Sequence, residues 1–215
     1  MWPEYSYSTY SSRGFFSFSE REKKDILISI VVLTFSFAMA FSGITFGFVS
    51  FKAFLLFFLP VAFLAVITGF FLHEMGHRMV ARYYGCWAEF RLWPMGLLLA
   101  LFSSFFGAVF AAPGAVYILG FLDREKNGKI SAAGPMMNIV VALSMFPIIS
   151  LGGYAGSIAY FIAWINVFLA GFNLIPFPPL DGYKVFQWGI IPYIIMAAIV
   201  MSTWVSLGYV KAMFL

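Results

Sequence analysis

The stretch FLHEMGH at residues 71–77 places two histidines and a glutamate within a segment that is otherwise apolar. On a helix, residues four apart lie on the same face about one turn from each other, so His73 and His77 can offer two imidazole nitrogens to one metal ion. This pattern is typical of metallopeptidases, in which two histidines and one further ligand hold Zn²⁺ tetrahedrally and the glutamate takes a proton from water. We therefore predict that His73 and His77 are zinc ligands and that Glu74 is the catalytic base.

The composition indicates an integral membrane protein. Of 215 residues, 62% are hydrophobic and 10% are charged, so apolar side chains far exceed what one soluble core could bury. Several runs contain no Asp, Glu, Lys or Arg. A helix that crosses a membrane needs about 20 consecutive apolar residues. These runs span residues 26–51, 53–73, 92–122, 130–180 and 185–210. We predict an all-α polytopic protein of the cell membrane with about five to six transmembrane helices.

The few polar residues exclude other classes of site. Lys and Arg cluster beside the apolar runs and form no extended basic stripe, so we expect no nucleic-acid partner. The single cysteine, Cys86, excludes an internal disulfide and a multi-cysteine metal site. With no third histidine, a carboxylate must complete the zinc ligands.

The positive charges also predict the orientation of the chain. Residues 1–25 form an interfacial or cytoplasmic tail, in which Ser19 and Glu22 make a capping-box pattern that opens a helix. Three basic residues then precede a first transmembrane helix at 26–50, so the N-terminus is expected in the cytoplasm. A second helix at 53–84 returns the chain, which places the histidines within the depth of the bilayer, towards its cytoplasmic side.

The run at 86–122 is broken by prolines and glycines. A single crossing would leave the basic residues at 124–129 outside the cell, against the rule that positive charges stay inside. We predict a re-entrant segment or a β-hairpin, whose backbone is covered by protein or lines a wet cavity. A short helical hairpin that crosses twice is the alternative. Residues 123–129 are then expected to form a solvated cytoplasmic turn.

Two further helices are expected at 131–150 and 157–175, crossing outward and back. Pro135 falls in the predicted opening turn of the first, where its missing N–H costs least. Asn138 falls just inside the membrane, where an unpaired amide is expensive. It therefore either bonds to another helix or serves the site.

The loop at 176–184 contains three prolines that stop the preceding helix. Asp181 is the only acidic residue beyond the turn at 123–129, and the predicted topology brings it to the same cytoplasmic depth as His73 and His77. It is therefore the best-placed third ligand, although Asp-Gly after prolines can also be an ordinary turn. A last transmembrane helix is expected within 185–215.

Three motifs carry a family resemblance. The stretches HEMGH at 73–77, AGPMMN at 133–138 and NLIPFPPLDG at 173–182 resemble, in order and spacing, the signatures of the site-2 protease family of intramembrane zinc metalloproteases. The resemblance covers about Thr68 to Lys184. It implies a three-helix catalytic core within residues 53–184.

The resemblance also implies an activity and a set of roles. It implies a zinc metalloendopeptidase that hydrolyses peptide bonds within or near transmembrane segments of membrane-anchored proteins, with a site that opens to the cytoplasm. Segment 86–120 resembles the strands that present substrate. Asn138 and Asn173 match family positions near the site and are candidate contacts to the substrate or transition state. The implied zinc ligands are His73, His77 and Asp181, with Glu74 as the base. A PDZ insertion and a nucleotide-sensing domain are not expected, so what selects the substrate stays open. The sequence does not determine the oligomeric state.

Two other functions fit parts of this pattern. A metal transporter needs polar residues through both halves of the membrane, whereas the outer half here offers no charge except Lys52 and Lys211 at its margin. A catalytically silent relative acting as a membrane scaffold is disfavoured, because all four catalytic-type residues are present.

Overall fold

The computed structural model describes residues 17–214, so most of the tail predicted at 1–25 lies outside the described residues. In chain order the elements are α1 (Glu20–Ser42), η2 (Ile44–Phe46), α2 (Phe51–Ala53), η3 (Phe54–Phe58), α3 (Leu59–Val66), η4 (Ile67–Phe71), α4 (Leu72–Tyr83), β1 (Trp87–Leu92), α5 (Pro94–Ser104), β2 (Gly114–Leu119), α6 (Arg124–Ser144), α7 (Phe146–Ile149), α8 (Gly153–Asn173), α9 (Asp181–Trp188) and α10 (Ile190–Phe214).

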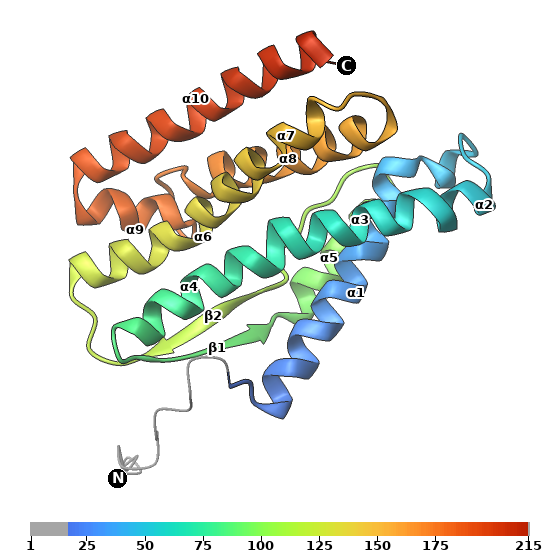
Figure 1. The fold of residues 1–215 in the computed structure, drawn as a ribbon. Helices are drawn as coiled ribbons and strands as arrows, with labels where there is room; N and C mark the ends of the chain where they lie inside the picture. Colours follow the sequence, from blue (N-terminus) through green and yellow to red (C-terminus); the bar gives the residue numbers. More distant parts are fainter. Residues whose placement is uncertain (1–16, 215) are drawn as a thin grey trace.

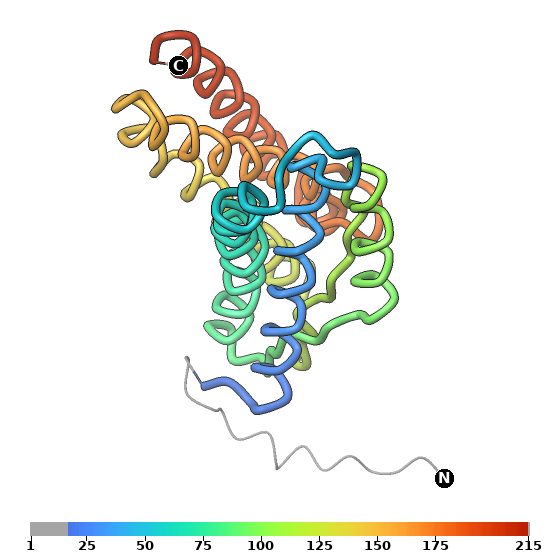
Figure 2. Tube along the Cα trace, turned by 90° about the vertical axis from the view of Figure 1, so that its right-hand side faces the viewer, coloured from blue at the N-terminus to red at the C-terminus, as the bar shows by residue number. Residues whose placement is uncertain are grey.

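Five helices within the described part of the chain are long and apolar enough to cross a membrane. They are Glu20–Ser42, Phe51–Tyr83, Arg124–Ile149, Gly153–Asn173 and Ile190–Phe214. This confirms the prediction of an all-α polytopic membrane protein with only a small sheet. α1 lies between α3 and α5, and α10 packs against α8 (Figure 1 and Figure 2).

The first helix starts and ends earlier than the predicted range of 26–50. Ser19 caps its N-terminus, where the hydroxyl accepts a hydrogen bond from the Glu22 N–H at 3.1 Å. Gly43, with a left-handed φ of 62°, closes the other end. Residues 20–25, which we assigned to the tail, are therefore the first turns of α1, and the helix start predicted at Ser19 is confirmed.

The second crossing is one helix from Phe51 to Tyr83. Two π-helical stretches, η3 and η4, interrupt its α-helical turns. η4 directly precedes α4, which carries HEMGH. Such π-bulges often occur at functional sites, because they turn the residues that follow relative to the rest of the helix.

Residues 86–122 form the predicted strand pair, with one short helix between the strands in place of the alternative helical hairpin. β1 and β2 pair antiparallel, from Trp87 opposite Leu119 to Leu92 opposite Gly114, and α5 lies between them in the chain. We interpreted Pro94 as a break, but it occupies the start of α5, where a missing N–H is tolerated. The sheet contacts both α1 and α4 (Figure 1).

Two predicted loops are partly helical. α6 begins at Arg124, not 131, because the Asp123 side chain accepts a hydrogen bond from the Lys126 N–H at 2.7 Å and caps the helix. The charged turn predicted at 123–129 is thus helix, and Pro135 lies in its interior. Likewise, the loop predicted at 176–184 ends before Asp181, which begins α9, since a negative charge suits a helix N-terminus.

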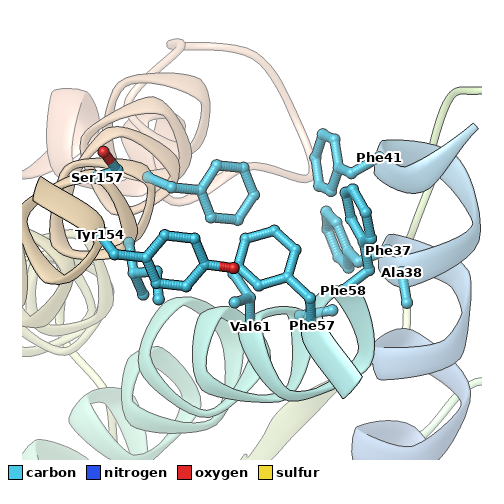
Figure 3. Close-up of a pocket in the computed structure, with 11 residues that line it drawn as sticks. Phe37, Ala38, Phe41, Phe57, Phe58, Val61, Tyr154 and Ser157 are labelled. Atoms are coloured by element: carbon cyan, nitrogen blue, oxygen red, sulfur yellow. The ribbon is translucent and has the colours of Figure 1, made fainter. Parts of the chain in front are cut away.

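A cavity of about 280 Å³ lies between α1, η3, α3 and α8 (Figure 3). Its wall is mainly aromatic, and the labelled rings of Phe37, Phe57 and Tyr154 point into it. No His, Asp or Glu lines it. This cavity is therefore separate from the histidines of α4.

A buried ion pair joins α1, α4 and β1. Arg78 donates from Nε to Oε1 of Glu22 at 2.8 Å, and the two side chains are 1% and 0% exposed. The same carboxylate accepts the backbone N–H of Phe90 in β1 at 3.0 Å. The Phe18 ring covers the guanidinium at 4.1 Å. Arg78 therefore fixes α4 against α1 and β1.

We expect Arg78→Met to lower the free energy of unfolding by about 3–5 kcal/mol, because it leaves the Glu22 carboxylate buried without a counter-charge. The double variant Arg78→Met/Glu22→Gln should recover part of this loss, since it buries no charge. Unfolding in detergent, followed by the loss of helical signal, measures both.

The matched control is Lys23→Met, which removes an ion pair between the exposed side chains of Lys23 and Glu20. It should change stability little, because solvent screens such pairs. If the double variant were less stable than Arg78→Met, the two charges would not act as a pair.

Candidate metal centre

The site forms where α4 and α6 approach each other closely at two glycines. A Cβ on Gly76 of α4 would lie 2.8 Å from the carbonyl oxygen of Ala133 in α6. A Cβ on Gly134 of α6 would lie 2.3 Å from Nε2 of His77 and 2.6 Å from Nε2 of His73. Only glycine fits at these contacts, so the spacing of the two helices depends on both residues.

The two histidines lie on one face of α4, as their spacing predicted. Both are buried, and their Nε2 atoms are 3.0 Å apart. Such a pair of nitrogens inside an apolar helix bundle is costly unless a cation or a proton lies between them. The cluster is thus built around a positive charge.

Asp181 reaches the histidines from the start of α9. Its Oδ2 lies 3.3 Å from Nε2 of His73 and 3.2 Å from Nε2 of His77. A Cβ on the next residue, Gly182, would lie 2.0 Å from the Leu174 carbonyl oxygen, so only glycine permits this tight return of the chain. The structure brings together the three residues that we predicted as ligands.

The charge of Asp181 suits a ligand. Burial alone would raise the pKa of its carboxyl, but the neighbouring His77 and His73 hold that pKa well below its usual range. A charged carboxylate is the form that binds a metal.

The geometry of the cluster fits zinc. Tetrahedral Zn²⁺ with bonds of about 2.0 Å holds its ligand atoms about 3.3 Å apart. The three separations here, between the two Nε2 atoms and Oδ2 of Asp181, are 3.0, 3.2 and 3.3 Å. Two nitrogens and one carboxylate oxygen are also a usual donor set for catalytic zinc, which keeps a fourth position for water.

The other ring nitrogens orient the histidines. Nδ1 of His77 lies 2.8 Å from the carbonyl oxygen of Ile130, and Nδ1 of His73 lies 2.6 Å from Oδ1 of Asn138. A carbonyl oxygen only accepts hydrogen bonds, so each Nδ1 carries a hydrogen, and in the neutral ring each Nε2 then presents a lone pair to the cluster. Metal-binding histidines are typically held in this way.

Glu74 lies beside the cluster without joining it. Its carboxylate lies close to His73, His77 and Asp181, and also to the backbone of Val116 in β2. The glutamate thus lies between the three candidate ligands and the sheet. A base there can act on water held at the cluster.

The two predicted asparagines differ in position. Asn138 is completely buried beside His73 and bonds across helices, which confirms the interhelical reading, whereas its role at the site stays a prediction. Asn173 ends α8, where its amide donates to the Leu169 carbonyl at 3.0 Å. A contact of either residue with substrate stays a prediction. We missed Asn166, which bonds to Asn138; an uncharged amide inside an apolar helix was the signal available.

The comparisons with known proteins agree with this site. The family model described as peptidase family M50 matches residues 150–215. "Putative zinc metalloprotease MJ0611" of Methanocaldococcus jannaschii is 44% identical over 179 residues, which cover 80% of this chain and 87% of that protein. "Zinc metalloprotease MJ0392" of the same organism is 30% identical, over 60% of this chain and 34% of that protein. "Putative zinc metalloprotease YwhC" of Bacillus subtilis is 29% identical, over 60% of this chain and 68% of that protein. No solved structure matches the chain.

We expect Gly134→Ala to weaken zinc binding at least about tenfold, because the added methyl group displaces both Nε2 atoms. The fold should persist, since alanine favours a helix more than glycine does. Zinc affinity measured by competition with a chelator tests this. Gly208→Ala in α10 is the control, because nothing lies within 4 Å of its added methyl group. Equal zinc affinity of the two variants would contradict the assignment.

Proposed function

The chain belongs to the site-2 protease family of zinc metalloproteases, peptidase family M50, and from this we propose that it hydrolyses peptide bonds within or near the transmembrane segments of membrane-anchored proteins. The observation that carries the proposal is the convergence of His73, His77 and Asp181 beside Glu74, within a bundle of membrane-crossing helices. We assign the catalytic membrane core to residues 53–184.

The three converging residues would hold one zinc ion through two Nε2 atoms and one carboxylate oxygen. The chemistry that zinc supplies when bound is polarisation of the scissile carbonyl and acidification of water. Asp181 also contributes a negative charge that offsets the metal in a low-dielectric setting. The helix contact at Gly134 keeps the two imidazoles in place.

Glu74 acts as the general base. Its carboxylate takes a proton from water as the water oxygen bonds to the scissile carbon. The glutamate then gives this proton to the amine nitrogen as the carbon–nitrogen bond breaks. Its place outside the ligand set supports this role, because a carboxylate that bound the metal could not carry the proton.

The edge of the sheet is suited to holding the substrate. A helical substrate hides its carbonyl groups in backbone hydrogen bonds, so it must unwind before cleavage. Within the described residues β2 pairs only with β1, and its Val116 lies next to Glu74. An extended substrate segment that adds to this sheet would lie beside the base.

Asn173 is retained as a proposed contact to the substrate or transition state. It ends α8 just before the proline-rich loop that leads to Asp181. Its position at the start of the loop that leads to a proposed ligand supports this role. For Asn138, its complete burial against His73 supports an action through the histidine.

Two substitutions separate the base from the ligands. Glu74→Gln should keep zinc and lower the cleavage rate by about 10²–10⁴-fold, because it removes the base and leaves the ligands. Asp181→Asn should weaken zinc binding and abolish most cleavage, because it removes the charge that offsets the metal. Zinc content and cleavage of a single-helix membrane substrate measure both effects.

The control is Asp123→Asn at the cap of α6, which should change neither property, because asparagine caps a helix as well as aspartate. Zinc content and cleavage of Asp181→Asn equal to wild type would refute the three-residue site.

We also propose that the N-terminus of α1 and the metal site face the cytoplasm. Basic residues gather at the start of α1, at the end of α4 and at the start of α6. If each of the five candidate helices crosses the membrane once, these three helix ends lie on the same side of it. The opposite ends carry Lys52 and Lys211 alone.

Cysteine labelling tests this orientation in a Cys86→Ser background. Arg124→Cys, at the start of α6, should resist an impermeant thiol reagent applied to intact cells. Leu151→Cys lies at an exposed turn between α7 and α8 and should react with the reagent. Reaction of the cysteine at 124 from outside would overturn the proposed orientation.

A further inference from the structure

A chain of buried, uncharged side chains leads from His73 into α8. Asn138 and Asn166 are both 0% exposed, and Nδ2 of Asn138 donates to Oδ1 of Asn166 at 2.9 Å. This series of hydrogen bonds continues to Thr68 in the second membrane-crossing helix. The Thr68 hydroxyl accepts a hydrogen bond from Nδ2 of Asn166 at 3.2 Å. The proposed mechanism does not use Asn166.

The direction of each bond in this chain is determined. The Asn138 amide nitrogen donates its two hydrogens to the carbonyl oxygen of Gly69 and to Oδ1 of Asn166, each at 2.9 Å. Its oxygen is therefore the atom that faces Nδ1 of His73, at 2.6 Å. Because that oxygen can only accept, a hydrogen of His73 is held on Nδ1, and Nε2 is then the bare nitrogen of the neutral ring.

The orientation of Asn166 is determined in the same way. Its amide group donates to the Ile162 carbonyl at 2.9 Å and to the Thr68 hydroxyl. That hydroxyl in turn donates to the Leu64 carbonyl at 2.8 Å, so it is an acceptor for Asn166. The oxygen of Asn166 has to face Asn138. In this sense the backbone carbonyls at both ends set the tautomer of a metal-site histidine.

We propose that Asn166 is a positioning residue of the metal centre, which holds Asn138 in the orientation that keeps Nε2 of His73 bare and aimed at the metal. The inference rests on the metal site proposed above. Without Asn166, one N–H of Asn138 is buried with no acceptor, and only Gly69 then opposes rotation of the amide. The ring of His73 loses a fixed support, whereas His77 is held separately by Ile130.

The test replaces Asn166 by leucine and, as a smaller change, by alanine. Zinc affinity, measured by competition with a chelator, should fall by about 10- to 100-fold, as it does when partners of metal-binding histidines are lost. The control is Thr203→Val in α10, which removes a buried hydroxyl bonded only within its own helix, to Ile199. It should leave zinc affinity unchanged.

Nitrogen-15 signals of the imidazoles in zinc-free protein separate positioning from folding. The chain has only two histidines, and a His77→Gln variant assigns their signals. In the Asn166 variants, His73 should lose its single Nδ1–H state while His77 keeps it.

An unchanged His73 signal together with wild-type zinc affinity would overturn the proposal. Equal change at both histidines would also overturn it, because Asn166 would then support the fold as a whole. Wild-type protein that binds no zinc would instead refute the proposed function, while the nitrogen signals would still test Asn166.

Discussion

The contact of α4 with α6 is the constraint on which the site depends. Because Gly76 and Gly134 add no side chain, the backbone of α6 comes close enough for Ile130 and Asn138 to bond to the two histidines. α6 also packs against α9, which begins with Asp181. One close helix contact thus orients two proposed ligands and lies beside the element that carries the third.

The membrane setting explains why the polar groups occur in closed systems. A bilayer cannot supply hydrogen bonds to a buried amide, imidazole or carboxylate, so each needs a partner from the protein. Glu22 and Arg78 satisfy each other and the backbone of β1, and the asparagines near His73 satisfy one another. The first system contains two opposite charges and connects elements of the fold, whereas the second is neutral and connects to the site.

The loop before α9 shows how backbone rules bring a distant residue to the site. Prolines stop α8, and Gly182 lets the chain turn back against Leu174. A carboxylate at the first position of the next helix then meets the histidines. This arrangement agrees with membership of a zinc metalloprotease family, and it leaves Glu74 between the ligands and the sheet, where the proposed mechanism needs a base.

The sequence by itself determined the features that follow from local geometry and composition. The helix pitch puts His73 and His77 on one face, the apolar runs require a polytopic membrane protein, and the order of crossings brings Asp181 to their depth. Helix caps and the strand–helix–strand segment were partly misjudged, because Asp123 and Pro94 can either break or begin a helix.

Only the tertiary structure decided the partners of Arg78, the hydrogen bond of Asn138 to His73, and the hydrogen bond of Asn138 to Asn166. In a membrane the helices are apolar on nearly every face, so their sequences do not reveal how each is rotated about its axis, and that rotation decides which buried polar groups meet.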